Sequence, residues 1–261
     1  MATKFFYIHK ILLCALGALC LSTQATAAEV SLSTIRQKAD RFYRYEEWAN
    51  ALAMFRAILE RDPSDIQTYG RSVTVFGVIN NPEEQIELLE NTQKYALPLD
   101  SLFNQVKISA FEIGRPEILE NFMILVKKEQ PWLKRNINIR LARYYDSRNN
   151  AEKMIEMSDT LLAVNPDDPS MLHIKARGNM LLDRYDDAVA LYKRIIDLSP
   201  DDTDAMLCIG VYYFTEFDTR RLALSSPEAD EARKYLSMAY RLRPTDHLRQ
   251  MLDRLNTPSP K

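Results

Sequence analysis

Apolar and polar positions follow one pattern at two widely separated places in the chain. Residues 50–65 read NALAMFRAILERDPSD and residues 187–202 read DAVALYKRIIDLSPDD. In each stretch an alanine is followed by an aromatic residue four positions on, an isoleucine three further on and a proline five after that. Spacings of three and four place apolar side chains on one face of an α-helix, and a proline ends the helix. The pattern therefore predicts two similar amphipathic helices, each stopped by a proline.

The distance between the two stretches indicates a repeat. They lie 137 residues apart, close to four periods of 34. Prolines mark the copies between them at steps of 35, 33, 35, 34 and 44, where the last step is one period plus an insertion of ten. These prolines are Pro63, Pro98, Pro131, Pro166, Pro200 and Pro244. A regular period of this length predicts an array of six units over residues 32–257.

The repeat resembles the tetratricopeptide repeat (TPR) family, whose 34-residue unit is a helix–turn–helix. The first, fifth and sixth copies carry small residues where two helices would cross and large ones around them. In the fifth copy these positions are Leu172, Ala176, Tyr185, Ala188, Tyr192, Ile195 and Pro200. The second and third copies keep the register only through their prolines and lengths. The resemblance implies an all-α fold, a right-handed superhelical solenoid of about six repeats.

Two segments depart from the regular repeat. Residues 245–256 carry Leu248, Met251, Leu252 and Leu255 at helical spacing, which predicts a helix that caps the last repeat, followed by a disordered tail over 258–261. The segment 216–227 accounts for the long proline step and predicts a protrusion within the sixth repeat. Whether it contacts a partner or only lengthens the helices stays open, and its removal is expected to leave stability nearly unchanged.

The first 27 residues have the features of a secretory signal peptide. Lys4 and Lys10 come before an apolar run over 11–21, and Ala25-Thr26-Ala27 provides an Ala-x-Ala cleavage site. The pattern predicts export, to the periplasm or out of the cell, after cleavage near Ala27, without stable membrane insertion of the mature chain. An uncleaved N-terminal anchor is the alternative.

The net charge of the chain indicates which kinds of partner it can bind. The formal charge of −2 becomes −4 when Lys4 and Lys10 leave with the signal peptide. A mildly acidic chain without a basic block disfavours nucleic acid or an anionic membrane as the main partner. A protein or a peptide is the expected partner.

The mature sequence has no recognisable catalytic or cofactor motif. His173 and His247 are its two histidines, and Cys208 is its single cysteine, so neither a zinc motif nor an internal disulfide is expected. Aspartates that follow the repeat prolines suit helix N-caps better than a cation site. We therefore expect no cofactor, no metal and no enzymatic activity.

The family resemblance implies a binding scaffold whose first helices line a concave groove. The repeat positions that face such a groove in the family give a candidate set of Arg36, Tyr43, Asn104, Phe111, Arg143, His173, Arg177 and Phe214. The alternative is that some of these residues pack between repeats. The family's carboxylate clamp is not expected, because Asp40 would repel a terminal carboxylate beside Arg36.

Arg143 and Arg177 lie 34 residues apart and predict a ladder of guanidinium groups on adjacent first helices. The plainer alternative is an ion pair of Arg143 with Asp146 one turn away. The sequence as a whole predicts an exported adaptor in a cell-envelope complex. The alternative is a subunit of an envelope enzyme, for example one related to peptidoglycan.

Overall fold

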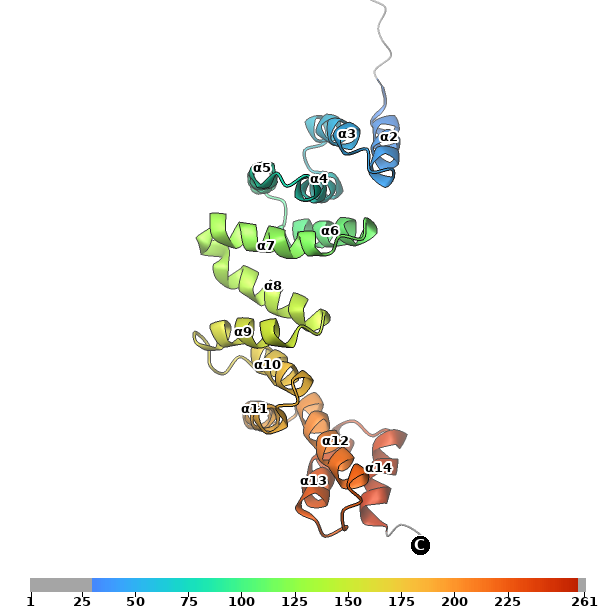
Figure 1. Cartoon of the computed structure of the whole chain (residues 1–261), viewed down its shortest axis with the longest axis vertical. Helices are drawn as coiled ribbons and strands as arrows, with labels where there is room; N and C mark the ends of the chain where they lie inside the picture. The colour runs from blue at the N-terminus through green and yellow to red at the C-terminus, as the bar shows by residue number, and fades with distance from the viewer. Residues whose placement is uncertain (1–29, 258–261) are drawn as a thin grey trace, which may run out of the picture. The chain divides into compact units, whose positions relative to one another are not determined.

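The computed structural model describes residues 30–257, and its helices follow one another without an intervening strand in that range (Figure 1). The predicted signal peptide and the predicted tail at 258–261 lie outside the described residues. The thirteen α-helices and one 3-10 turn of residues 30–257 are α2 (Leu32–Arg44), α3 (Trp48–Arg61), α4 (Ile66–Val78), α5 (Pro82–Lys94), α6 (Leu99–Glu112), α7 (Glu117–Glu129), η1 (Pro131–Leu133), α8 (Lys134–Ser147), α9 (Ala151–Leu162), α10 (Pro169–Leu181), α11 (Tyr185–Leu198), α12 (Thr203–Thr219), α13 (Pro227–Leu242) and α14 (Asp246–Asn256).

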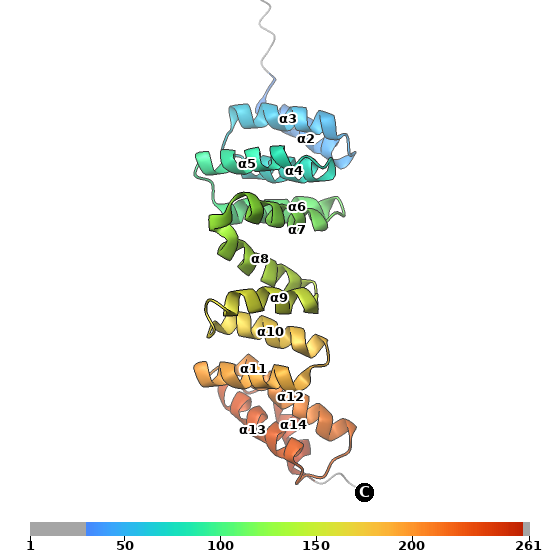
Figure 2. The same cartoon turned by 60° about the vertical axis from the view of Figure 1, so that its left-hand side comes forward.

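Consecutive helices pack as hairpins, which confirms the predicted all-α repeat of helix pairs. The pairs α2–α3, α4–α5, α8–α9, α10–α11 and α12–α13 each pack along one another, and Figure 2 shows most of these helices along their length. The chain forms two compact units that divide within α7, one ending at Ile118 and the other beginning at Leu119. In the N-terminal unit the first helices α4 and α6 also lie side by side, and in the C-terminal unit α10 packs against α9.

The repeated phrase of the sequence forms the hydrophobic core of both units. Ala51, Phe55 and Ile58 of α3 are at most 1% exposed, and they pack with α2 residues such as Ala39. Their counterparts on α11, which are Ala188, Tyr192 and Ile195, are buried against α10 and α12. The small residue lets the two helices of a hairpin approach, and the larger ones fill the space on either side.

Aspartates after the repeat prolines cap the next helix, as the sequence predicts. Asp65 accepts a hydrogen bond from the Thr68 amide at 3.0 Å, and Asp202 accepts one from the Ala205 amide at 2.8 Å. Asp168 does the same for α10 through the amide of Met171. Each cap satisfies an amide that the first helical turn leaves without a partner.

A second periodic feature appears in the backbone of the turns within the hairpins. Residues with positive φ occur at Glu46, Asn80, Gly114, Asn149 and Asp183, which step by 34, 34, 35 and 34. A left-handed residue after a helix reverses the chain tightly. Only one of the five is a glycine, so the turn geometry repeats although the residue type does not.

The insertion in the sixth hairpin is partly helix and partly anchored loop. It lengthens α12 to 17 residues, and Ser226 then caps α13 through the amide of Ala229. Arg233 donates to the carbonyls of Leu224 and Leu255 at 3.1 and 3.0 Å, and Phe217 packs against the core beneath α14. These contacts hold the segment against α13 and α14, and the expected small effect of its removal stays a prediction.

Candidate functional site

In the N-terminal unit, Arg71 links the first helices of successive hairpins, which are α2, α4 and α6. The side of a unit that its first helices form is called the first-helix face below. The Arg71 guanidinium on α4 pairs with Asp40 on α2, and its second nitrogen lies 3.6 Å from the Glu112 carboxylate on α6. The guanidinium also lies over the Tyr43 ring, 5.1 Å from its centroid. One arginine thus joins three successive first helices and places two acidic groups beside it.

Tyr43 was expected to face a groove, and the structure corrects this. Its side chain is 0% exposed, and its hydroxyl donates to the Ser109 carbonyl of α6 at 2.9 Å. Burial, followed by the charge of Glu112, raises the pKa of the Tyr43 hydroxyl well above its usual range. Tyr43 therefore positions α2 against α6 from within the core.

An exposed, partly apolar surface remains on α6. Asn104, Ile108 and Phe111 are four and three residues apart and share one side of the helix. Ile108 is 52% exposed and Phe111 is 48% exposed, while Asn104 is also exposed. Large apolar side chains beside an amide are typical of protein interfaces.

In the C-terminal unit the two arginines of the predicted ladder are placed differently. Arg177 on α10 donates to Asp146 and Asn149 at the end of α8, with both distances 2.6 Å. Asp146 therefore pairs with Arg177 and not with Arg143, which was the predicted alternative. Arg143 is exposed. The first helices α8 and α10 are thus joined through Arg177, and Arg143 is left facing solvent.

His173 continues these links to the next first helix. Its Nε2 lies 2.9 Å from a carboxylate oxygen of Asp202, the N-cap of α12. Burial alone would raise the pKa of Asp202, but the hydrogen bonds from His173 and from the Ala205 amide outweigh it, so this pKa lies below its ordinary value. His173 therefore serves as a link between neighbouring repeats.

Phe214 is buried, whereas Arg36 is exposed and held in ion pairs. Phe214 is only 8% exposed, since it packs in the core under α14 and meets the Arg254 guanidinium at 5.2 Å, so its expected place in a groove is wrong. Arg36 is partly exposed but donates to Asp62 and Asp65 at 2.8 and 2.9 Å. The Asp65 hydrogen bond raises the pKa of the Arg36 guanidinium.

Sequence reasoning missed Arg71 because the second repeat was too irregular to place in register. The available signal was the pair Asp40 and Arg71, which lie 31 residues apart, since Asp146 and Arg177 lie 31 apart as well. In both cases a carboxylate late in one first helix meets an arginine in the middle of the next. The spacing of opposite charges therefore carried information that the apolar pattern of this repeat did not.

Candidate metal ligands, the single described cysteine and helix hydropathy complete the description of residues 30–257. No group of three or more histidine, cysteine, aspartate or glutamate side chains in that range is arranged to hold a metal ion. Cys208 is half-buried, and this burial raises the pKa of its thiol. None of the helices in the described part of the chain is both long and apolar enough to cross a membrane.

Comparisons with known proteins place the chain beside other helical-repeat structures. No protein-family model matches it, and no curated protein matches it. PilW, a widely conserved type IV pilus biogenesis factor, shares 14% identity over 85% of this chain and 98% of its own, with a TM-score of 0.47. The C-terminal part of a TPR repeat-containing protein from Cytophaga hutchinsonii shares 11% identity over 80% of this chain and 78% of its own, with a TM-score of 0.46. A tetratricopeptide repeat protein from Parabacteroides merdae shares 13% identity over 87% of this chain and 99% of its own, with a TM-score of 0.39. Likeness at these TM-scores carries no argument about function.

Proposed function

We propose that the protein is a binding scaffold that holds a peptide segment or a partner protein on its first-helix face. The observation that carries this proposal is the surface of α6, where Ile108 and Phe111 stand about half exposed beside Asn104. Exposed apolar side chains of this size mark interaction sites when they are gathered on one face. The neighbouring Arg71 pairs stiffen the face, so little order has to be gained on binding.

The C-terminal unit offers a candidate binding surface of its own. Arg143 is exposed and presents a guanidinium that can bind a carboxylate through two parallel hydrogen bonds. Arg177 keeps 48% of its side chain exposed although it pairs with Asp146. An acidic or carbonyl-rich segment of the partner is the expected ligand of this pair.

Affinity purification with mass spectrometry, using the tagged full chain in its native cells, tests the scaffold. The variant Arg143→Ala plus Arg177→Ala should recover far less of the specific partners. The matched control is Arg184→Ala plus Arg194→Ala, at the N-cap and within the second helix α11. Arg194 is 47% exposed and pairs with Asp167 at 2.6 Å, much as Arg177 pairs with Asp146. Exposed pairs of this kind are each worth under about 1 kcal/mol, so both variants stay folded. Equal partner recovery from the two double variants would rule out a role of Arg143 and Arg177. Ile108→Ser plus Phe111→Ser tests the α6 surface in the same way, and undiminished recovery from that variant would rule out the surface that carries the proposal.

Export and membership of an envelope complex are part of the proposal. The N-terminal basic, apolar and Ala-x-Ala segments support cleavage near Ala27. Intact-mass measurement on protein from the envelope fraction should show the loss of about the first 27 residues. Recovery of the chain with Met1 in place would contradict cleavage and favour the anchor.

A further inference from the structure

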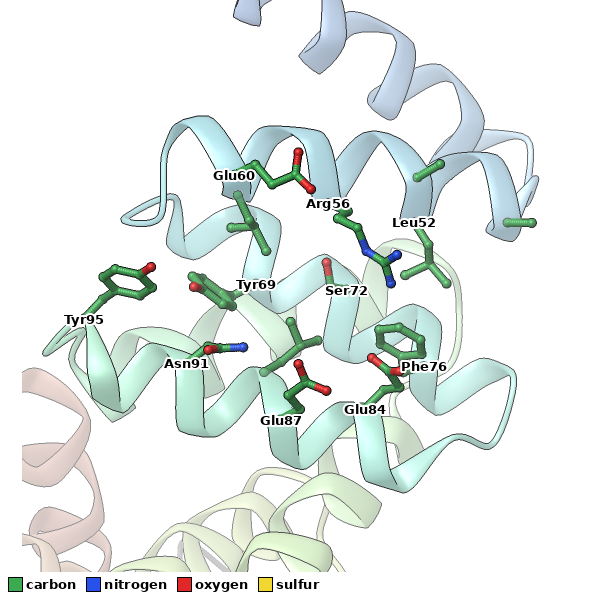
Figure 3. A pocket seen from close by; sticks show the side chains of 14 residues that line it. Leu52, Arg56, Glu60, Tyr69, Ser72, Phe76, Glu84, Glu87, Asn91 and Tyr95 are labelled. Atoms are coloured by element: carbon green, nitrogen blue, oxygen red, sulfur yellow. The ribbon is translucent and has the colours of Figure 1, made fainter.

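The second helices of the first two hairpins flank a hollow that the first-helix face does not use. The α3–α5 hollow lies between α3 and α5, with α4 as its floor, and has a volume of about 530 Å³ (Figure 3). Its floor is formed by Tyr69, Ser72 and Phe76, which recur on one side of α4. Arg71 projects from another side of the same helix to pair with α2 and α6. One helix thus serves two separate surfaces.

The floor and walls of the hollow combine apolar side chains with polar and charged ones. Leu52, Leu59 and Leu88 are half-buried along the walls. Tyr69 is only 2% exposed. Burial raises the pKa of its hydroxyl, so the hydroxyl stays protonated and able to donate a hydrogen bond.

The charged side chains on the rim of the hollow favour a positively charged ligand. Glu60 extends from α3, and Glu84 and Glu87 extend from α5, while Arg56 is the one cationic side chain among the lining residues (Figure 3). None of these four groups forms an ion pair within residues 30–257. The rim therefore carries an excess of two negative charges above an apolar floor. Complementary charge steers and selects partners at such surfaces.

We propose that the α3–α5 hollow binds an amphipathic segment of a partner protein, with apolar side chains against Leu52, Phe76 and Leu88 and lysines or arginines against Glu84 and Glu87. Two flanking helices with an apolar floor form the kind of groove that receives an amphipathic segment. The carboxylates stand on the rim instead of converging on the floor, as they would in a site for a small polar molecule. This site is independent of the first-helix face, because it uses different residues and a different charge.

Isothermal titration of the full chain with a designed peptide tests the proposal. The probe is an amidated peptide of about 14 residues, long enough to form a helix on binding, with leucines at helical spacing and lysines elsewhere. A peptide with glutamates in place of the lysines is the charge control. We expect the lysine peptide to bind and the glutamate peptide to bind at least about tenfold more weakly, which corresponds to about 1.4 kcal/mol.

Variants of the protein locate the binding to the hollow. Glu84→Gln plus Glu87→Gln should weaken the lysine peptide by about tenfold. The matched control is Glu83→Gln plus Glu90→Gln, since these exposed glutamates lie on α5 outside the lining and remove the same charge. Ala53→Trp places an indole in the hollow from an exposed wall position and should abolish binding, while its circular dichroism stays that of the wild type.

Three results would overturn the proposal. The first is an equal loss of affinity in both glutamine pairs, which would show that only net charge matters. The second is undiminished binding to the folded Ala53→Trp variant, which would place the peptide elsewhere. The third is tighter binding to a chain that begins at residue 28 than to the full chain, which would assign the hollow to the chain's own first residues.

Discussion

Single residues decide how closely neighbouring helices approach. Gly70 on α4 faces α6, and a Cβ added at Gly70 would lie 2.4 Å from the Gln105 Cβ and 2.8 Å from its carbonyl carbon. Real atoms do not approach this closely, and a backbone atom cannot move aside as a flexible side chain can. The absence of a side chain at Gly70 therefore sets the distance between two first helices.

Gly70→Ala is expected to destabilise the protein by about 1–3 kcal/mol through overpacking, although alanine is the better helix former by about 1 kcal/mol. Urea unfolding followed by circular dichroism measures the change. Gly210→Ala is the comparison, because its added Cβ meets mainly the Leu236 side chain, which can move, and a smaller loss is expected. A Gly70→Ala variant as stable as the wild type would contradict the close approach of α4 and α6.

Asp202 links stability to pH, because its carboxylate has a lower pKa in the folded chain than its ordinary value of 3.8. A depressed folded pKa stabilises the fold above the unfolded pKa, and this contribution is lost as pH falls through the folded pKa. Asp202→Asn keeps an N-cap oxygen but removes the charge that His173 contacts. It should lower stability at about pH 7 and lessen the loss of stability on acidification below 3.8.

Thermal melts between about pH 7 and about pH 3 measure this contribution. Asp168→Asn is the structural control, since Asp168 caps α10 in the same way through the amide of Met171. Identical pH profiles for wild type and Asp202→Asn would show that the contact with His173 contributes nothing.

Among whole elements, α14 covers an apolar side of the last hairpin. It lays Leu248, Met251 and Leu255 against α13, where they are 4%, 6% and 0% exposed. Without α14 the apolar side chains that it contacts on the hairpin would lie in water. Helix α14 also contacts the inserted segment and the helix that follows it. Arg254 pairs with Asp218, and the Leu255 carbonyl accepts a hydrogen bond from Arg233.

Leu255→Ala is expected to cost about 2–5 kcal/mol, because it empties a fully buried position. Leu252→Ala on the same helix should cost less, since Leu252 is only half-buried. Chemical denaturation of both variants measures the difference. Equal losses would mean that α14 does not dock through the side that contains Leu255.

At the scale of the whole molecule, stability is expected to be distributed over local cores. The cluster around Phe55 includes Ile35, Ala39 and Tyr43, whereas the cluster around Leu255 includes Leu236 and Ala239. The two clusters have no residue in common, and they belong to different compact units. In repeat arrays, stability is approximately a sum of repeat and nearest-neighbour terms.

Hydrogen exchange measured by mass spectrometry should therefore respond locally to core substitutions. Phe55→Ala should lower protection in α2, α3 and α4 and leave α12, α13 and α14 nearly unchanged, while Leu255→Ala should do the reverse. A uniform loss of protection along the chain from either substitution would indicate a single cooperative unit.

The sequence alone determined the parts of this protein that depend on neighbouring residues. Apolar spacing placed Ala51, Phe55 and Ile58 in the core, because a helix turns these positions to one side whatever surrounds it. Aspartates after prolines became N-caps, because the cap is a contact over three residues. The all-α hairpin repeat follows from these local rules.

The tertiary structure decided which helix sides meet. Each residue turns an α-helix by about 100°, so an error of one residue in the assigned repeat register moves a side chain from an open face into a core. For this reason Tyr43 and Phe214 are buried, Arg177 meets Asp146, and Arg71 becomes the centre of a face. The α3–α5 hollow likewise depends on how far apart two helices stand, and the spacing of residues along the chain does not contain that distance.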